Sequence, residues 1–183
     1  MKYDLIHIKE KFNADEKLDF LFFWGHQPKK DGSISQSCFS QWWVQPFEVE
    51  GKTYKTAEHW MMAGKARLFN DTEMLEKIIE TDSPKTAKGL GRKVKNFNQQ
   101  TWEANRYEIV KEGNLHKFSQ HNDLKKFLLD TGDQVIVEAS PFDPIWGIGL
   151  AKDQEGIENP NTWKGLNLLG FALMEVRDEL SIN

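Results

Sequence analysis

The chain has 183 residues, which suits one domain with at most a short extension. Its net charge of −4 argues against a general nucleic-acid binder, because such proteins usually carry a basic surface. Cys38 is the only cysteine, which excludes an intrachain disulfide and a cysteine metal cluster. No apolar run approaches the ~18 residues of a membrane span, and no signal-peptide pattern opens the chain. We therefore expect a cytoplasmic protein that does not enter a membrane.

The first half of the chain predicts a flanking segment, short strands and three helices. Residues 1–19 are charged and weakly patterned, and we interpret them as an N-terminal extension of a domain over residues 20–183. Residues 20–24 (FLFFW) form an apolar run typical of a buried strand, and residues 47–54 alternate as in a small hairpin. N-cap signals then start predicted helices at Thr56 (to about Phe69), at Asp71, and at Ser83-Pro84 (to about Gly91).

The second half predicts more helix and one clear strand. A longer helix, weakened at Gly113, is expected from about residue 98 to residue 118, and a short one over residues 122–129. Residues 134–139 (QVIVEA) are the clearest strand, and residues 141–160 the longest loop. A terminal helix follows over residues 166–180. The predicted fold class is α+β, as a single compact helix-rich domain with a few short strands.

The most informative segment is TYKTAEHWMMAGK, from Thr53 to Lys65. It places Glu58 and Lys65 seven residues apart in one predicted helix. At about 100° per residue the two side chains return to nearly the same face, roughly 10 Å apart along the axis. Met61 and Met62 occupy the stripe between them. Two opposite charges on either side of apolar surface indicate one wall of a cleft.

Each candidate residue also has an ordinary structural interpretation. Glu58 lies early in its helix, where the dipole favours a carboxylate, and it either supports the helix start or serves chemistry. Lys65 either extends along the helix or contacts a phosphate, and Arg92 either satisfies carbonyls at a helix end or binds substrate. Trp102 is either a core residue or stacks on a planar base, a contact worth about 1–3 kcal/mol. Asp143 is either a turn former or a functional acid in a rigid loop.

Several short motifs occur together in a fixed order from about residue 20 to residue 180. They are Glu50-Gly-Lys-Thr-Tyr54, Thr56-Ala-Glu58-His-Trp60 with Lys65, Leu90-Gly91-Arg92, Trp102, Asp143-Pro-Ile-Trp146-Gly147, and the closing pattern over residues 165–177. This set resembles the YbiA-like (NADAR) family of N-glycosidases. The chain differs from the family pattern at Cys38, at Ile148 and in an insert over residues 152–162.

The resemblance implies hydrolysis of an N-glycosidic bond in a ribosyl phosphate, with Glu58, Asp143 and Trp102 as catalytic residues. Such a reaction builds positive charge on the sugar, which a carboxylate near C1′ stabilises. No metal and no organic cofactor is expected. The predicted substrate-binding residues are Lys65, Trp24, Gly25, Arg92, Trp146, Gly147 and Asn167.

Three functions stay open at this point. The first is an N-glycosidase acting on ribosylamino-pyrimidine phosphate intermediates of riboflavin biosynthesis. The second is a hydrolase that removes ADP-ribose from guanine, in nucleic acid or in a nucleotide. The third is a module that binds NAD or ADP-ribose without hydrolysis. In each case the expected partner is a small ribosyl-phosphate or ADP-ribose-type molecule, and a modified base is the only nucleic-acid substrate expected.

Overall fold

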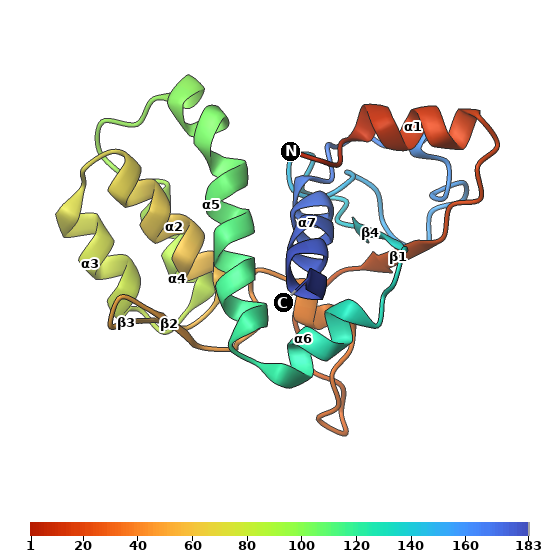
Figure 1. Cartoon of the computed structure of the whole chain (residues 1–183). Coiled ribbons are helices and arrows are strands. Elements are labelled where there is room, and N and C mark those ends of the chain that lie inside the picture. The colour runs from red at the N-terminus through yellow and green to blue at the C-terminus, as the bar shows by residue number, and fades with distance from the viewer. Residues whose placement is uncertain (183) are drawn as a thin grey trace. The chain divides into compact units, whose positions relative to one another are not determined.

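The structure is a computed structural model that describes residues 1–182 (Figure 1). Its internal contacts divide into two units. One comprises residues 1–40 together with the chain from residue 122 onward, and the other comprises residues 41–121. Residues 1–182 form seven α-helices and four short strands in two two-stranded sheets. The predicted helix-rich α+β class is confirmed.

The unit of residues 41–121 contains a hairpin and four helices. Strands β2 and β3 pair antiparallel, and helices α2, α3 and α4 follow before the longer α5. Each helix begins at a side-chain cap, because Thr56, Asp71, Ser83 and Asn98 each accept a backbone N–H three residues on. The first three of these caps were predicted from the sequence. The bounds are β2 Phe47–Val49, β3 Lys52–Tyr54, α2 Ala57–Leu68, α3 Thr72–Glu80, α4 Pro84–Gly91 and α5 Gln99–Ser119.

Helices α2 and α5 approach closely because each presents a glycine to a large side chain of the other (Figure 1). A Cβ on Gly113 would lie 2.3 Å from the Trp60 ring, and one on Gly64 would lie 2.6 Å from Ile109. The Trp60 indole also donates to the Ile109 carbonyl, with an N–O distance of 2.8 Å. Helix α5 stays continuous at Gly113, where the missing side chain makes room for Trp60.

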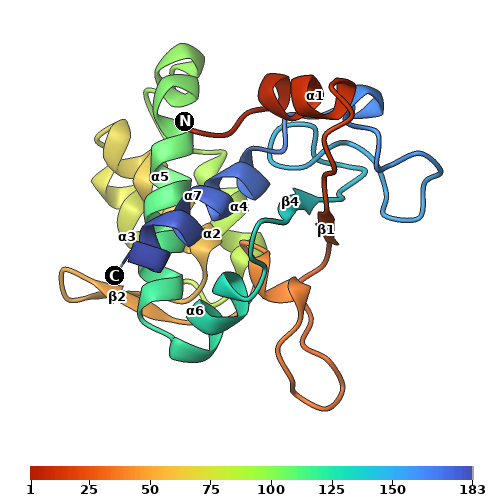
Figure 2. The same ribbon diagram turned by 45° about the vertical axis from the view of Figure 1, so that its right-hand side comes forward.

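The other unit is built on a pair of parallel strands (Figure 2). Strand β1 pairs with β4 in the register Phe20–Val135 to Phe23–Glu138, and α7 packs against β4. Parallel strands are usually buried, and here Val135, Ile136 and Val137 are all buried. The bounds in this unit are α1 Leu5–Asn13, β1 Phe20–Phe23, η1 Gln36–Phe39, α6 Asn122–Leu129, β4 Val135–Glu138, η2 Pro160–Thr162 and α7 Leu168–Ile182.

Helix α1 lies within residues 1–19, where the sequence analysis expected no regular element. Its N-cap is Asp4, its Ile8 is buried, and it packs against η2. The Lys2 ammonium, just before the helix, lies 2.6 Å from the Asp178 carboxylate. The helix was missed because its few apolar residues are separated by charged ones. This stretch therefore packs onto the unit that contains β1 and β4.

None of the helices within residues 1–182 combines the length and the apolar character that crossing a bilayer requires.

Candidate active site

Glu58 lies in the first turn of α2, where its position is fixed from two sides. The Thr56 side chain caps the helix, and the Glu58 backbone N–H donates to the Gln41 carbonyl over 2.9 Å. The Glu58 side chain is only 2% exposed, and Met61 and Met62 on the same stripe are buried as well. The positive end of the helix dipole faces a carboxylate here. The predicted stripe therefore exists, with its acid at the helix N-terminus.

Lys65, at the other end of this stripe, lies against two aromatic rings. Its ammonium nitrogen is 4.1 Å from the centre of the Phe97 ring and 5.5 Å from that of the Trp102 ring. It forms no hydrogen bond or ion pair with any residue from 1 to 182. Burial lowers the pKa of this ammonium. A half-buried cation beside a half-buried indole, without an anionic partner in that range, is suited to an anionic ligand.

Arg92 caps the C-terminus of α4 through its backbone N–H, which donates to the Leu90 and Lys88 carbonyls. Its side chain is exposed to solvent. Within residues 41–121, the structure therefore brings Lys65 and Trp102 together and places Arg92 at a helix end with an exposed side chain.

Asp143, in the other unit, forms a turn with one of its two carboxylate oxygens. Oδ1 accepts the backbone N–H groups of Ile145 (2.9 Å) and Trp146 (2.8 Å). Oδ2 makes no hydrogen bond within the described part of the chain. The turn-forming interpretation is correct for Oδ1, and Oδ2 is available for a substrate. The catalytic role of Asp143 stays a prediction.

The segment that carries Asp143 and Trp146 is tied to the entry of α7. Backbone N–H groups over residues 164–169 donate to carbonyls over residues 144–148, with five N–O distances between 2.9 and 3.3 Å. The two stretches approach so closely that a Cβ on Gly165 would lie 2.3 Å from the Gly147 carbonyl oxygen. This ladder makes the segment rigid, which favours a precise position for Trp146 and Gly147.

Asn167 uses its amide inside the protein. Its Nδ2 donates to the Ile136 carbonyl (2.9 Å), and its Oδ1 accepts the Glu138 N–H (3.0 Å). The side chain is fully buried, and its backbone has a φ of 54°. Asn167 thus links β4 to the start of α7, and its predicted contact with substrate stays a prediction.

An open groove lies beyond the carboxyl ends of β1 and β4, with a volume of about 620 Å³. Two exposed aromatic residues line it: Trp24 is 59% exposed and Phe142 is 85% exposed. Gly25, next to Trp24, has a φ of 80°, which glycine adopts at little cost. The groove has the size of a small-molecule site, and its rings suit a planar ligand. Its lining residues are Trp24, Ala139, Pro141, Phe142, Ala151, Lys152 and Asp153.

Two aromatic residues, one beside Lys65 and one in the groove of the other unit, were not predicted from the sequence. Phe97 precedes the cap of α5 and Phe142 precedes Asp143, and neither position has a periodic pattern that would show its environment. Conversely, Cys38 and Ile148, two of the three departures from the family pattern, are both fully buried. These two residues therefore belong to the core of their unit.

Comparison with known proteins gives the family. A family model described as the NADAR domain matches residues 22–181. The chain belongs to the NADAR family. An N-glycosidase of Acanthamoeba polyphaga mimivirus is 45% identical over 165 residues, which cover 87% of this chain and 95% of that protein. N-glycosidase YbiA of Escherichia coli is 33% identical over 144 residues, covering 79% of this chain and 81% of YbiA.

The fold of this NADAR protein is also that of a solved relative. The NMR structure of E. coli YbiA matches with a TM-score of 0.69 at 30% identity, over 91% of this chain and 88% of that one. The chain is therefore an enzyme, a glycosyl hydrolase of the N-glycosidase class. This result removes the non-catalytic binding module from the three functions that the sequence left open.

Proposed function

We propose that this NADAR N-glycosidase hydrolyses the C1′–N bond of a phosphorylated ribosylamino-pyrimidine, an intermediate of riboflavin biosynthesis, in the cytoplasm. The observation that carries the proposal is the environment of Lys65. Its ammonium is half-buried over the Phe97 and Trp102 rings and has no carboxylate partner within residues 1–182. A phosphate is an anion that satisfies such a cation through charge-assisted hydrogen bonds.

The reaction assigns a role to the carboxylate at the other end of the stripe. As the C1′–N bond breaks, the sugar becomes oxocarbenium-like and the electron pair of the bond leaves with the base nitrogen. Glu58 stabilises the positive sugar or takes a proton from the attacking water, whose oxygen forms the new bond to C1′. The proton released from water finally resides on the base nitrogen. Met61 and Met62 keep bulk water away from this face of α2.

Aromatic faces suit the leaving base. Trp102 is half-buried beside the Lys65 ammonium. An indole face stacks on a heterocyclic base whichever base it is. The Trp24–Phe142 groove offers a second aromatic surface, next in sequence to Asp143. The predicted roles of Asp143, as an acid or base, and of Trp146 and Gly147, as substrate contacts, belong to this second surface.

A second candidate substrate is ADP-ribose attached to guanine. The observation that favours it is the open form of the Trp24–Phe142 groove, since a base that remains part of a nucleotide or nucleic acid needs an open site. The two candidates share the reaction and differ in the product that is released.

A direct assay separates them. The protein is incubated with a ribosylamino-pyrimidine 5′-phosphate and, separately, with DNA that carries ADP-ribosylated guanine. Release of ribose 5-phosphate from the first supports the proposal, and release of ADP-ribose only from the second favours the alternative. A protein that hydrolyses neither substrate would refute both.

The role of Lys65 has a matched control. Lys88 also lies over an indole, with its ammonium 5.9 Å from the Trp42 ring centre. Hydrogen bonds to charged groups contribute about 1.5–3 kcal/mol, so Lys65→Gln should raise KM for the phosphorylated substrate by about 10- to 150-fold. Lys88→Gln should leave KM within twofold. Equal effects of the two substitutions would exclude a specific phosphate contact by Lys65.

A further inference from the structure

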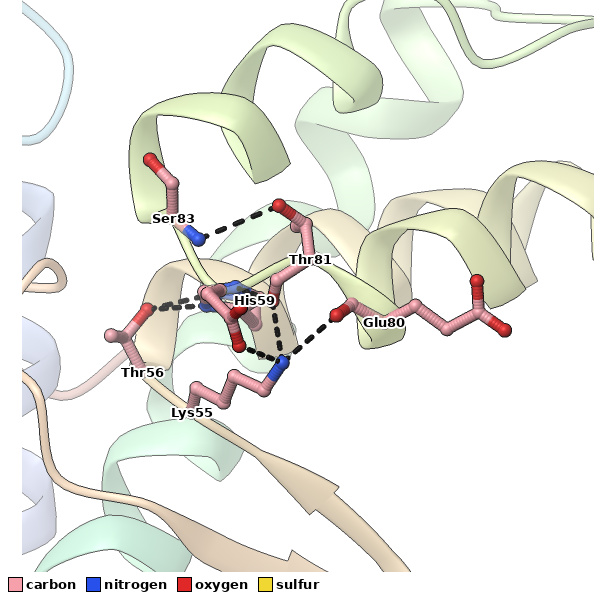
Figure 3. Close-up of polar contacts among 7 residues, drawn as sticks. Lys55, Thr56, His59, Glu80, Thr81 and Ser83 are labelled. Atoms are coloured by element: carbon pink, nitrogen blue, oxygen red, sulfur yellow. Dashed lines mark hydrogen bonds and ion pairs between the residues drawn. The ribbon is translucent and has the colours of Figure 1, made fainter.

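His59, the residue after Glu58, is a buried imidazole for which the reaction described above has no use. Its side chain is 0% exposed. Nδ1 lies 2.8 Å from the Thr56 hydroxyl and Nε2 lies 3.0 Å from the Thr81 carbonyl oxygen (Figure 3). The ring therefore connects the N-cap of α2 with the segment that joins α3 to α4.

These contacts determine which ring nitrogen carries the proton. A carbonyl oxygen only accepts, so Nε2 must donate to Thr81. In the neutral ring Nδ1 is then an acceptor, and the Thr56 hydroxyl donates to it. The same Thr56 oxygen accepts the His59 backbone N–H over 3.4 Å. In the neutral Nε2–H tautomer, both ring nitrogens of His59 and the Thr56 hydroxyl therefore have partners.

The connection between α3 and α4 is held from a second direction as well. The Lys55 ammonium donates to the carbonyls of Glu80 (2.9 Å) and Thr81 (3.0 Å) and to the Asp82 carboxylate (2.6 Å). Figure 3 shows the Glu80 carboxylate pointing away from this cluster. Lys55, three residues before Glu58, and His59, directly after it, therefore both bind the same short segment.

We propose that His59 is a positioning residue for catalysis: as the neutral Nε2–H tautomer it anchors the first turn of α2 to Thr81 and so holds the Glu58 carboxylate in place. This inference rests on the proposed role of Glu58 at the sugar. A displacement of the order of 1 Å at a reacting group can cost about 100-fold in rate. Loss of the anchor therefore affects kcat, whereas substrate contacts elsewhere keep KM.

The charges around the ring support a neutral imidazole. Burial is the main factor that lowers the pKa of His59, and the nearby Lys55 ammonium lowers it further. The hydrogen bond to Thr81 and the Asp82 carboxylate act in the opposite direction, but the net change is downward. Protonation would place a hydrogen on Nδ1, so the Thr56 hydroxyl could no longer donate to that nitrogen.

Two substitutions separate the anchor from the local cap. The amide of His59→Gln reaches the position of Nε2 and can donate to Thr81, whereas the shorter amide of His59→Asn reaches only the position of Nδ1 and Thr56. We expect His59→Asn to lower kcat at least tenfold with KM within twofold of wild type, and His59→Gln to restore kcat to within about threefold. The substrate is whichever of the two candidates the wild type hydrolyses.

His121→Asn is the matched control. His121 also bridges a side chain and a carbonyl, those of Gln45 (3.0 Å) and Pro46 (2.8 Å), and neither partner lies in α2 or in the α3–α4 connection. The His121→Asn variant should leave kcat unchanged.

The protonation state of His59 can be measured directly. Ring ¹⁵N chemical shifts of the wild type at neutral pH should show His59 protonated on Nε2 alone. A merely structural role would not link this protonation state to turnover.

The outcomes are distinguishable. If His59→Asn folds and turns over like the wild type, or if His59→Gln is as slow as a folded His59→Asn, the positioning role is refuted. If His59→Asn does not fold, the kcat of His59→Gln and the tautomer of His59 in the wild type decide the question. A kcat of His59→Gln far below that of the wild type, or a proton on Nδ1 in place of Nε2, overturns the inference. A wild type inactive on both substrates refutes the proposed function instead.

Discussion

The contact of Gly113 with Trp60 allows a quantitative test of how α2 is held against α5. In Gly113→Ala the new Cβ would lie 2.3 Å from the Trp60 ring, about 1 Å closer than the 3.4 Å at which ordinary contact begins. The Trp60 indole cannot easily move, because its N–H donates to the Ile109 carbonyl and its ring packs on the Tyr54 ring, with the two ring centres 4.8 Å apart. Overpacking of this kind costs about 1–3 kcal/mol, and alanine gains about 1 kcal/mol in helix propensity. Taking the upper end, we expect a net loss of about 2 kcal/mol.

Urea unfolding of matched variants measures this loss. Gly89 also lies inside a helix, α4, but a Cβ there would meet no atom within 4 Å. Gly89→Ala should therefore stabilise the protein by about 0.5–1 kcal/mol. If the unfolding free energies of the two variants change by the same amount, the Trp60–Gly113 contact does not hold α2 against α5.

Three further predictions concern the candidate site. Glu58→Gln should lower turnover at least 100-fold, as loss of a general acid–base group does, with an unchanged circular dichroism spectrum; activity within a few-fold of wild type would remove Glu58 from the mechanism. Trp102→Ala should weaken substrate binding more than folding, because the ring is half-buried; an unfolded variant would instead show a core role. Because the pKa of His59 is lowered from 6.5, the unfolded state takes up the proton first as the pH falls. The contribution of His59 to the unfolding free energy should be fully retained above pH 6.5 and decline below it, by at most about 1.4 kcal/mol per pH unit. His59→Gln should abolish this part of the decline, and urea titrations at several pH values measure it.

Local signals predicted most of the elements. The caps Thr56, Asp71 and Ser83 were found from sequence because a cap needs only a short polar side chain before a helical pattern. The strands β1 and β4 were found as apolar runs, but their parallel pairing was not, since it joins residues more than 100 positions apart. Pairing over such a separation leaves no local pattern.

The candidate site was predictable in residue type and only partly in environment. The helical spacing of Glu58 and Lys65 correctly gave a shared stripe, because helix periodicity alone fixes it. The rings around Lys65 come from α5 and from the segment before it, so their arrangement depends on tertiary packing. The same holds for Asn167, whose burial against β4 follows from its position at the start of α7.

The hydrogen bond from the Lys164 N–H to the Ile148 carbonyl closes the chain between them into a loop with a fixed base. The exposed tip of this loop can change length without moving Asp143, because the base is held by the ladder to residues 164–169. Each doubling of such a loop costs only about 0.6 kcal/mol in closure entropy. The exposed residues 154–156 are therefore a permissive point for evolution and for engineering: sequence can be inserted or removed there while the turn at Asp143 is preserved.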